Sequence, residues 1–201
     1  MGAGPTQVLD LGCGPGWTTQ LLADVFPAAT VLGLDRSAGF VEEAVGRADD
    51  DGGGGRLRFR CADVTALPLP GAPADLVFVR FLLAHLPEPG DVAQGWATQL
   101  RAGGVLAVEE VEDIATEDLD FTSYLSLTRG LVAHGGSDMY AGPLLARSLG
   151  GQVVTVAVTA GDAATLFSLN LETIRHDPWV VAARPAEEVD ALARRLAERR
   201  A

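Results

Sequence analysis

The sequence predicts an α/β protein with a three-layer, doubly wound and mostly parallel sheet. Between residue 7 and about residue 110, short apolar runs alternate with amphipathic stretches of helical spacing. Such alternation is typical of parallel strands joined by helical crossovers. The first apolar run, Val8 to Leu11, leads directly into Gly12, Gly14 and Gly16, and a helix-like stretch follows. A strand that passes through glycines into a helix brings bare backbone close to a ligand, so we expect a binding site there.

Five strands and their connecting helices are expected in this first part of the chain. The apolar runs that predict strands cover residues 8–11, 30–34, 57–60, 74–80 and 105–108. Amphipathic spacing predicts helices after Gly16, over 37–48 and over 92–100, the last ended by 101–104. Ser37 is the expected N-cap of the second helix.

The remainder of the chain is predicted to be mainly helical. Helices are expected over 117–134, 142–149, 163–175 and 185–200. Residues 152–159 are rich in valine and threonine and alternate, which predicts a sixth strand. Residues 179–183 are the only candidate for a seventh strand, and they are few.

The spacing of the glycines favours one class of ligand. It reads G-x-G-x-G, whereas the dinucleotide fingerprint G-x-G-x-x-G would need glycine at position 17, where Trp17 stands. The third glycine of that fingerprint lets helix and strand close around a pyrophosphate. We therefore expect a smaller group without phosphate at this loop, and an NAD-linked oxidoreductase is only the third hypothesis.

Residues 8–18, V-L-D-L-G-C-G-P-G-W-T, resemble motif I of class I S-adenosylmethionine-dependent methyltransferases. The junction L-R-A-G-G-V-L at 100–106 is also similar to this family, and the resemblance is close over 7–111. It implies the Rossmann-like class I methyltransferase fold with a helical lid after strand five. We expect one domain over 1–201, divided into a cofactor-binding core (1–111), a lid and substrate region (112–150), and a sixth strand with C-terminal helices (151–201).

Cofactor-binding residues are expected where the strands end. Asp35 follows the second strand and can accept hydrogen bonds from both ribose hydroxyls; its alternative role, capping a helix, is better filled by Ser37. The resemblance implies that Asp63 binds the adenine amino group, although a plain turn aspartate is the alternative. The complete set expected to bind S-adenosylmethionine is Asp10, Gly12, Cys13, Gly14, Gly16, Asp35, Arg36, Ala62, Asp63, Val64 and Arg80.

Candidates for catalysis and substrate binding carry weaker signals. His85 and His134 are candidate general bases, because histidine titrates near neutral pH, and helix orientation or packing is the alternative for each. Glu109 begins an acidic cluster that would attract an amine substrate, or else is a solvated loop. Tyr124, Arg129 and Tyr140 are candidate substrate contacts, with lid packing as the alternative. No metal site is expected, since the histidines lack ligand spacing and the acidic cluster lacks matching partners.

Composition bounds the remaining possibilities. The net charge of -12 opposes binding to nucleic acid or anionic lipid. No apolar run is long enough for a membrane span, and the N-terminus lacks a basic region before an apolar stretch, so we expect a cytoplasmic protein. We expect it to be a monomer or a homodimer. The two cysteines, Cys13 and Cys61, suit a reducing compartment and are expected to pack rather than react.

The hypothesis from the sequence is methyl transfer from S-adenosylmethionine to an oxygen or nitrogen of a small molecule. Such a displacement needs alignment and a dry site more than a catalytic triad. About six residues precede the first strand, where this family usually has covering helices. The alternative hypothesis is therefore a truncated or non-catalytic binding protein that keeps the fold.

Overall fold

The computed structural model describes residues 4–50 and 55–199, which form two compact units. Unit 1 contains the described residues up to Leu83 together with Glu88–Glu110, and unit 2 contains Ala84–Pro87 and the described residues from Val111 onward. Each unit has its own hydrophobic core. The elements in chain order are β1 (Gln7–Leu11), α1 (Trp17–Val25), β2 (Thr30–Asp35), α2 (Ala38–Asp50), β3 (Leu57–Cys61), β4 (Ala74–Arg80), η1 (Leu83–His85), α3 (Pro89–Ala97), β5 (Leu100–Glu109), α4 (Leu119–His134), α5 (Ala141–Leu149), α6 (Ala160–Ile174), α7 (Pro178–Ala183) and α8 (Ala186–Ala197).

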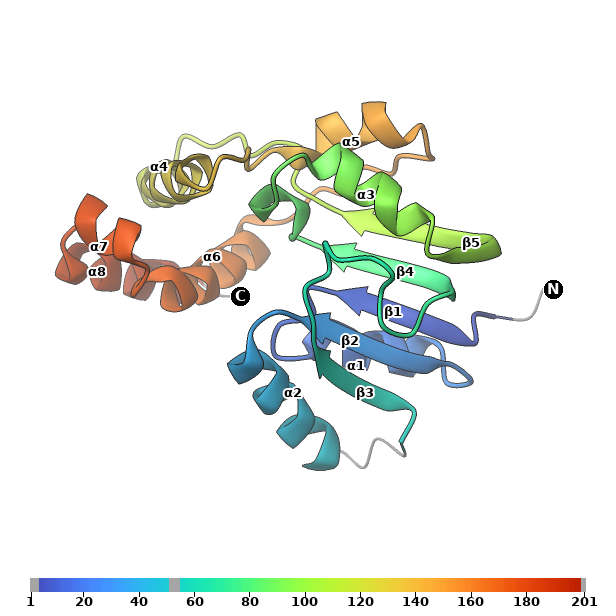
Figure 1. Ribbon diagram of the computed structural model, residues 1–201. Coiled ribbons are helices and arrows are strands. Elements are labelled where there is room, and N and C mark those ends of the chain that lie inside the picture. Colours follow the sequence, from blue (N-terminus) through green and yellow to red (C-terminus); the bar gives the residue numbers. More distant parts are fainter. Residues whose placement is uncertain (1–3, 51–54, 200–201) are drawn as a thin grey trace. The chain divides into compact units, whose positions relative to one another are not determined.

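Unit 1 is a five-stranded, entirely parallel sheet in the order β3-β2-β1-β4-β5 (Figure 1). The chain moves outward from β1 to β3, and then from β4 to β5 in the opposite direction. Because parallel crossovers are right-handed, this reversal places α1 and α2 on one face and α3 on the other. Figure 1 shows α1 behind the sheet and α3 in front of it. The doubly wound architecture expected from the sequence is confirmed.

The core of unit 1 explains why the strands are so apolar. Val8, Val31 and Leu76, from three neighbouring strands, are buried against Leu22 and Ala23 of α1. A parallel sheet covered on both faces needs near-continuous apolar strands, unlike a half-exposed sheet. The order of strands reverses between β1 and β4, and ligands of such sheets bind at the carboxyl ends beside that switch point. The fold therefore directs attention to the ends of β1, β2 and β4.

The third helix and the fifth strand differ from the sequence prediction. Helix α3 ends at Ala97 instead of residue 100, and β5 begins at Leu100 instead of residue 105. The pairing with β4 shifts register between Ala74 and Leu76, because Gly103 has a φ of 81° and accommodates an irregularity. The two glycines that suggested a break between helix and strand lie inside the strand.

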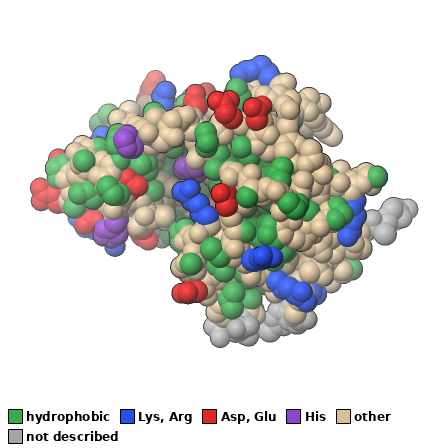
Figure 2. Space-filling model, viewed as in Figure 1, with side chains coloured by type: hydrophobic (Ala, Val, Ile, Leu, Met, Phe, Trp, Pro, Cys, Tyr) green, Lys and Arg blue, Asp and Glu red, His purple; other side chains and the backbone are tan. Residues whose placement is uncertain are grey.

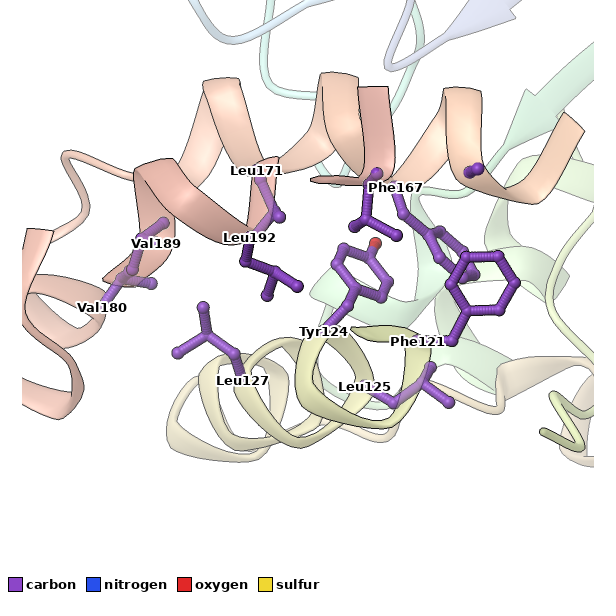
Figure 3. Close-up of a cluster of buried hydrophobic side chains, with 11 residues drawn as sticks. Phe121, Tyr124, Leu125, Leu127, Phe167, Leu171, Val180, Val189 and Leu192 are labelled. Carbon is purple, nitrogen blue, oxygen red and sulfur yellow. The ribbon is translucent and has the colours of Figure 1, made fainter. Parts of the chain in front are cut away.

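Unit 2 is helical, and its core lies between α4, α6, α7 and α8 (Figure 3). In Figure 3, side chains from α4 point toward those of α6 and α8. Tyr124 stacks on Phe167 with ring centroids 4.1 Å apart, and Phe121 meets the same ring edge-on at 5.4 Å. At the surface, Arg195 of α8 forms an ion pair with Asp120 of α4, and so does Arg199, which follows the end of α8. Aromatic packing and ion pairs thus join helices that are far apart in the sequence.

Helix boundaries in unit 2 follow capping side chains. Asp118 accepts hydrogen bonds from the backbone N–H groups of Asp120 and Phe121 at the start of α4. The Thr159 hydroxyl accepts a hydrogen bond from the N–H of Asp162 and caps α6. This helix therefore begins at Ala160, earlier than predicted. Helix α8 falls within the predicted range 185–200, of which residue 200 lies outside the described residues.

The predicted sixth strand is wrong. Residues 151–159 have neither strand nor helix structure, and Val153, Val154, Val156 and Val158 are 62–76% exposed. Alternating β-branched residues fit a strand, but a strand exists only where a neighbour supplies hydrogen bonds and a surface to pack on. None of the described strands pairs with this segment, so β5 ends the described sheet.

The segment that is the only candidate for a seventh strand is helical, because residues 178–183 form α7. Pro178 occupies the first turn of this helix, where its missing N–H is not needed. The Asp177 side chain accepts a hydrogen bond from the N–H of Trp179 at 2.8 Å and caps the helix. Val180 is buried in the core of unit 2, which fixes the helical face.

Candidate cofactor site

The glycine loop leaves β1 and is held by backbone hydrogen bonds to the end of β2. The N–H groups of Gly12 and Cys13 both donate to the carbonyl of Leu34, at 2.8 and 3.1 Å. Inside the loop, the Gly16 N–H donates to the Cys13 carbonyl at 3.0 Å, and α1 begins directly after Gly16. The loop is therefore a fixed turn between β1 and α1 that lies at the switch point of the sheet.

Two of the glycines have different reasons to be glycine. Gly12 has a φ of 70°, and a Cβ there would lie 2.9 Å from the Leu82 side chain, so a neighbouring turn packs onto its bare Cα. Gly14 has a φ of 52°, and a Cβ there would meet no atom within 4 Å. Left-handed backbone favours glycine at both positions. Gly14, however, borders open space, which leaves its backbone accessible to a ligand.

Asp35, the last residue of β2, connects its strand to this loop. One carboxylate oxygen accepts a hydrogen bond from the Gly14 N–H at 2.9 Å, and the other accepts one from the Ser37 N–H at 2.8 Å. A carboxylate oxygen can accept a second hydrogen bond. The side chain is only partly buried, so it retains acceptor capacity toward a ligand that lies over Gly14. This geometry fits the role in ribose binding that the sequence predicts.

Asp10 lies beneath the loop and is almost completely buried. The hydroxyl of Thr19 in α1 donates to its carboxylate at 2.6 Å. Burial raises the pKa of Asp10 from 3.8 to about 6, the Thr19 hydrogen bond opposes this rise, and the nearby Asp35 charge adds to it. A carboxylate held in such surroundings favours a positively charged neighbour.

The residues after β3 lie beside the end of β2. The Ala62 N–H donates to the Asp35 carbonyl at 2.9 Å, and Val64 is buried, with its carbonyl accepting a bond from the Trp96 indole at 2.7 Å. Asp63 is exposed and accepts bonds from the hydroxyl and N–H of Thr65, which keep its pKa below the ordinary value. The backbone of residues 62 and 64 is thus held by hydrogen bonds beside the end of β2.

The ends of β4 and β5 carry an exposed ion pair. Arg80 and Glu109 are register partners, and the Arg80 Nε lies 3.1 Å from a Glu109 carboxylate oxygen. The Arg80 guanidinium also lies 4.8 Å from the centre of the Phe81 ring. Glu109 is therefore already paired with a cation. The structure therefore gives no support to the expectation that Glu109 attracts an amine substrate.

The surroundings of the two cysteines fit a packing role for both. Cys13 is buried in the glycine loop, and burial raises the pKa of its thiol to about 12, so the reactive thiolate is disfavoured. Cys61 is exposed, and its thiol donates to the carbonyl of Arg36 at 3.4 Å. The exposed Arg36 thus contributes to the end of β2 through its backbone.

Apart from Glu109, the catalytic and substrate candidates lie in unit 2. His85 is exposed at the end of η1, and His134 is exposed at the end of α4, where its ring lies 6.1 Å from that of Trp179. The expected substrate role of Tyr124 does not fit the structure, because the side chain is buried and its hydroxyl donates to Asn170 at 3.0 Å. Its helix position was visible in the sequence, but its partner, from a distant helix, was not.

Arg129 and Tyr140 do lie together. The Arg129 guanidinium is 5.4 Å from the centre of the Tyr140 ring, and it forms no ion pair with any residue that the structure describes. A hollow of about 370 Å³ lies beside this arginine. It is lined by Arg129, Gly130, Ala133, Ser137, Asp138 and Met139. Arg129 is thus an exposed cation without an ion-pair partner among the described residues.

Three features of the site were not predicted from the sequence. Thr19 binds Asp10, Glu110 accepts two backbone hydrogen bonds after β4, and the Arg47 guanidinium lies 3.6 Å from the centre of the Trp17 ring. All three join positions on different elements. Trp17 gave a partial signal, because an aromatic residue directly after a glycine loop needs a partner or solvent.

The surface charges and the possible metal ligands bear on nucleic-acid, metal and membrane binding. Figure 2 shows arginine side chains spread singly over the visible face and not gathered into one basic patch. Within residues 4–50 and 55–199, no three His, Cys, Asp or Glu side chains form a group that could hold a metal ion. Among the same residues, no helix is both long and apolar enough to cross a membrane.

The fold is that of the class I S-adenosylmethionine-dependent methyltransferases. Residues 8–104 match the family model described as "Methyltransferase domain". The match begins in β1 and ends in β5, so it covers the glycine loop and Asp35. The expected family is confirmed.

Curated relatives share this half of the chain. Trans-aconitate 2-methyltransferase of Streptomyces coelicolor is 40% identical over 107 residues, which are 53% of this chain and 35% of that protein. The enzyme of the same name from Deinococcus radiodurans is 36% identical over 155 residues, 72% of this chain and 57% of that protein. The chain thus spans about a third to three fifths of the length of these relatives.

A solved structure extends the fold comparison to nearly the whole chain. The [4+2]-cyclase SpnF is similar with a TM-score of 0.62 and 23% identity, over 97% of this chain and 70% of that one. At this identity the likeness concerns the fold alone. Since that protein is called a cyclase, the fold by itself does not specify the reaction.

Proposed function

We propose that this protein transfers a methyl group from S-adenosylmethionine to an oxygen or nitrogen atom of a small molecule. The observation that carries the proposal is the Asp35 carboxylate on the Gly14 N–H, over the open side of a glycine loop. Asp35 would bind the ribose hydroxyls, the backbone of 62–64 would bind adenine, and the loop with Arg80 would border the methionine part. The bound cofactor supplies a methyl group on a sulfonium, a good leaving group.

The chain's own part in the reaction is alignment. As the bond from the acceptor atom to the methyl carbon forms, the carbon–sulfur bond breaks and its electrons remain on sulfur, giving a neutral thioether. Holding both reactants in line contributes much of the acceleration, because it removes the entropy cost of bringing them together. Asp10, buried below the loop, would stabilise positive charge in the ground state, so it is a binding residue and not a proton acceptor.

We infer further that the acceptor is an organic acid, methylated on a carboxylate oxygen. The curated relatives are named for trans-aconitate, an acid. Arg129, which has no ion-pair partner among the described residues, offers a guanidinium beside Tyr140 and the hollow in unit 2. Guanidinium groups bind carboxylates through two parallel hydrogen bonds. One acidic residue, Asp138, also lines that hollow.

An acid acceptor has a consequence for the histidines. A carboxylate is already ionised near neutral pH, so its oxygen needs no general base. With a phenol or an ammonium acceptor, His85 or His134 would remain a candidate base. We expect His85→Gln and His134→Gln to leave the pH profile of kcat unchanged with an acid. A lost ionisation in either variant would assign that histidine as the base.

The proposal is tested by separating binding from transfer. Calorimetric titration with S-adenosylmethionine, S-adenosylhomocysteine and NAD should give saturable binding of the first two only. The protein is then incubated with methyl-labelled cofactor and a panel of carboxylic acids, phenols and amines, and label in the extracted products is counted. Binding without transfer to any member would favour the non-catalytic alternative, and binding of NAD alone would favour an oxidoreductase.

Partners and location complete the proposal. The net charge of -12 and the dispersed arginines support a small-molecule partner over nucleic acid. We propose a cytoplasmic protein that acts as a monomer or homodimer. Light scattering at several protein concentrations distinguishes the two oligomeric states.

A further inference from the structure

The turn after β4 is fixed by the residues that end β5. Phe81 has a φ of 51°, which is uncommon for a residue with a side chain, and its N–H donates to the Glu109 carbonyl at 3.0 Å. The next two N–H groups, of Leu82 and Leu83, donate to the same carboxylate oxygen of Glu110, at 2.9 and 2.7 Å. Strained backbone persists only where its surroundings hold it. The Glu109 carbonyl and the Glu110 carboxylate therefore hold this turn together.

This turn also places a side chain against the glycine loop. The Leu82 side chain lies so close to Gly12 that a Cβ on that glycine would be 2.9 and 3.0 Å from its two methyl groups. On its other side the loop is held by the Leu34 carbonyl and the Asp35 carboxylate. The Gly12 end of the loop thus lies between the end of β2 and Leu82, and the backbone N–H of Leu82 is bound by Glu110.

We propose that Glu110 is a positioning residue for the cofactor: its carboxylate holds the Leu82–Leu83 backbone so that Leu82 rests on Gly12 and keeps the glycine loop open for binding. This inference rests on the proposed function, since it concerns the same loop. All the residues involved belong to unit 1. The effect passes through one carboxylate oxygen and one side-chain contact, so each can be removed separately.

The first test removes the carboxylate in two ways. Glu110→Ala loses both charge-assisted hydrogen bonds, and we expect its dissociation constant for S-adenosylhomocysteine to rise about tenfold. Glu110→Gln keeps a carbonyl oxygen at the same distance from the backbone, so we expect a rise of no more than about threefold. Glu117→Gln, an exposed carboxylate in the following segment, removes the same charge and is the matched control.

Hydrogen exchange measures the proposed bonds directly, without activity or ligand. In the wild type, we expect the amides of Leu82 and Leu83 to exchange more slowly than in Glu110→Ala, with the amides of β1 and β2 unchanged. Equal exchange in both proteins would overturn the assignment of Glu110. A general loss of stability would instead accelerate exchange throughout the sheet, and the denaturation midpoint reports it independently.

The second test is a double-mutant cycle with Leu82→Ala. If Glu110 acts on the loop through Leu82, the double variant should bind S-adenosylhomocysteine about as weakly as Glu110→Ala alone. Additive losses would contradict the route through Leu82, and unchanged affinity in both single variants would contradict the proposal as a whole. If the wild type itself bound no S-adenosylhomocysteine, the proposed function would fail, whereas slower Leu82 and Leu83 exchange would still support the geometry.

Discussion

The Gly14 N–H and the Asp35 carboxylate meet at 2.9 Å, although 21 positions separate them in the chain. This bond joins the end of β2 to the loop after β1, at the switch point of the sheet. It gives Asp35 two tasks, because the carboxylate that fixes the loop is also the acceptor expected for ribose. The first prediction follows from this double role.

Asp35→Ala should weaken the binding of S-adenosylhomocysteine at least about tenfold, or about 1.4 kcal/mol, because it removes the ribose acceptor and releases Gly14. Calorimetric titration measures the change. Asp24→Ala is the matched control, since this exposed aspartate on α1 accepts a hydrogen bond from its helix neighbour Gln20 and lies outside the glycine loop. Equal affinities for the wild type and Asp35→Ala would show that the ribose assignment is wrong.

Gly14→Ala should impair binding more than stability. The added methyl group meets no protein atom within 4 Å, but it occupies the open space where we place the ligand. Left-handed backbone costs alanine about 1–2 kcal/mol. Gly103→Ala controls for that cost, because Gly103 also has a positive φ and free space but lies in β5. Thermal unfolding and ligand titration of both variants separate the effects, and similar affinities would place the ligand elsewhere.

Asp10 should make stability depend on pH in an unusual direction. Its pKa is about 6 in the folded protein and 3.8 ordinarily, so between these values the folded state holds a proton that the unfolded state has lost. Stability from this group is complete below about pH 4 and is lost as the pH rises through 6. The amide of Asp10→Asn does not titrate in this range. As the pH rises from about 4 to about 7, the free energy of unfolding of the variant should therefore increase relative to that of the wild type, by about 3 kcal/mol at most.

Urea denaturation of the wild type and Asp10→Asn, from about pH 4 to about pH 7, measures this difference. Thr19→Val removes the hydroxyl that donates to Asp10. Because that hydrogen bond lowers the pKa of Asp10, we expect the pH at which the stability difference develops to be higher in this variant. A difference that stays constant with pH would mean that Asp10 is not buried as described.

Phe167→Ala should destabilise unit 2 by about 3–5 kcal/mol, because the ring is buried and contacts two other aromatic rings. Phe167→Leu keeps most of the volume, so it should cost clearly less. Denaturation followed by tryptophan fluorescence is a suitable measurement, since Trp179 packs against this core. Equal losses in both variants would indicate that aromatic geometry, and not volume, determines the stability.

The sequence by itself determined the parallel sheet, the glycine loop and the position of Asp35. These features are local: a run of apolar residues, a spacing of glycines and the residue at a strand end are each written in a few consecutive positions. Even the order of the strands is constrained, because crossovers have a fixed hand.

Only the tertiary structure decided the features that join distant segments. Residues 152–159 have strand composition but no partner strand among the described residues, Tyr124 is buried by α6, and the Glu110 carboxylate is occupied by the turn after β4. Hydrogen bonds and burial depend on which surfaces meet. Propensity is a property of one segment, whereas pairing and packing require two, and therefore no local pattern could supply them.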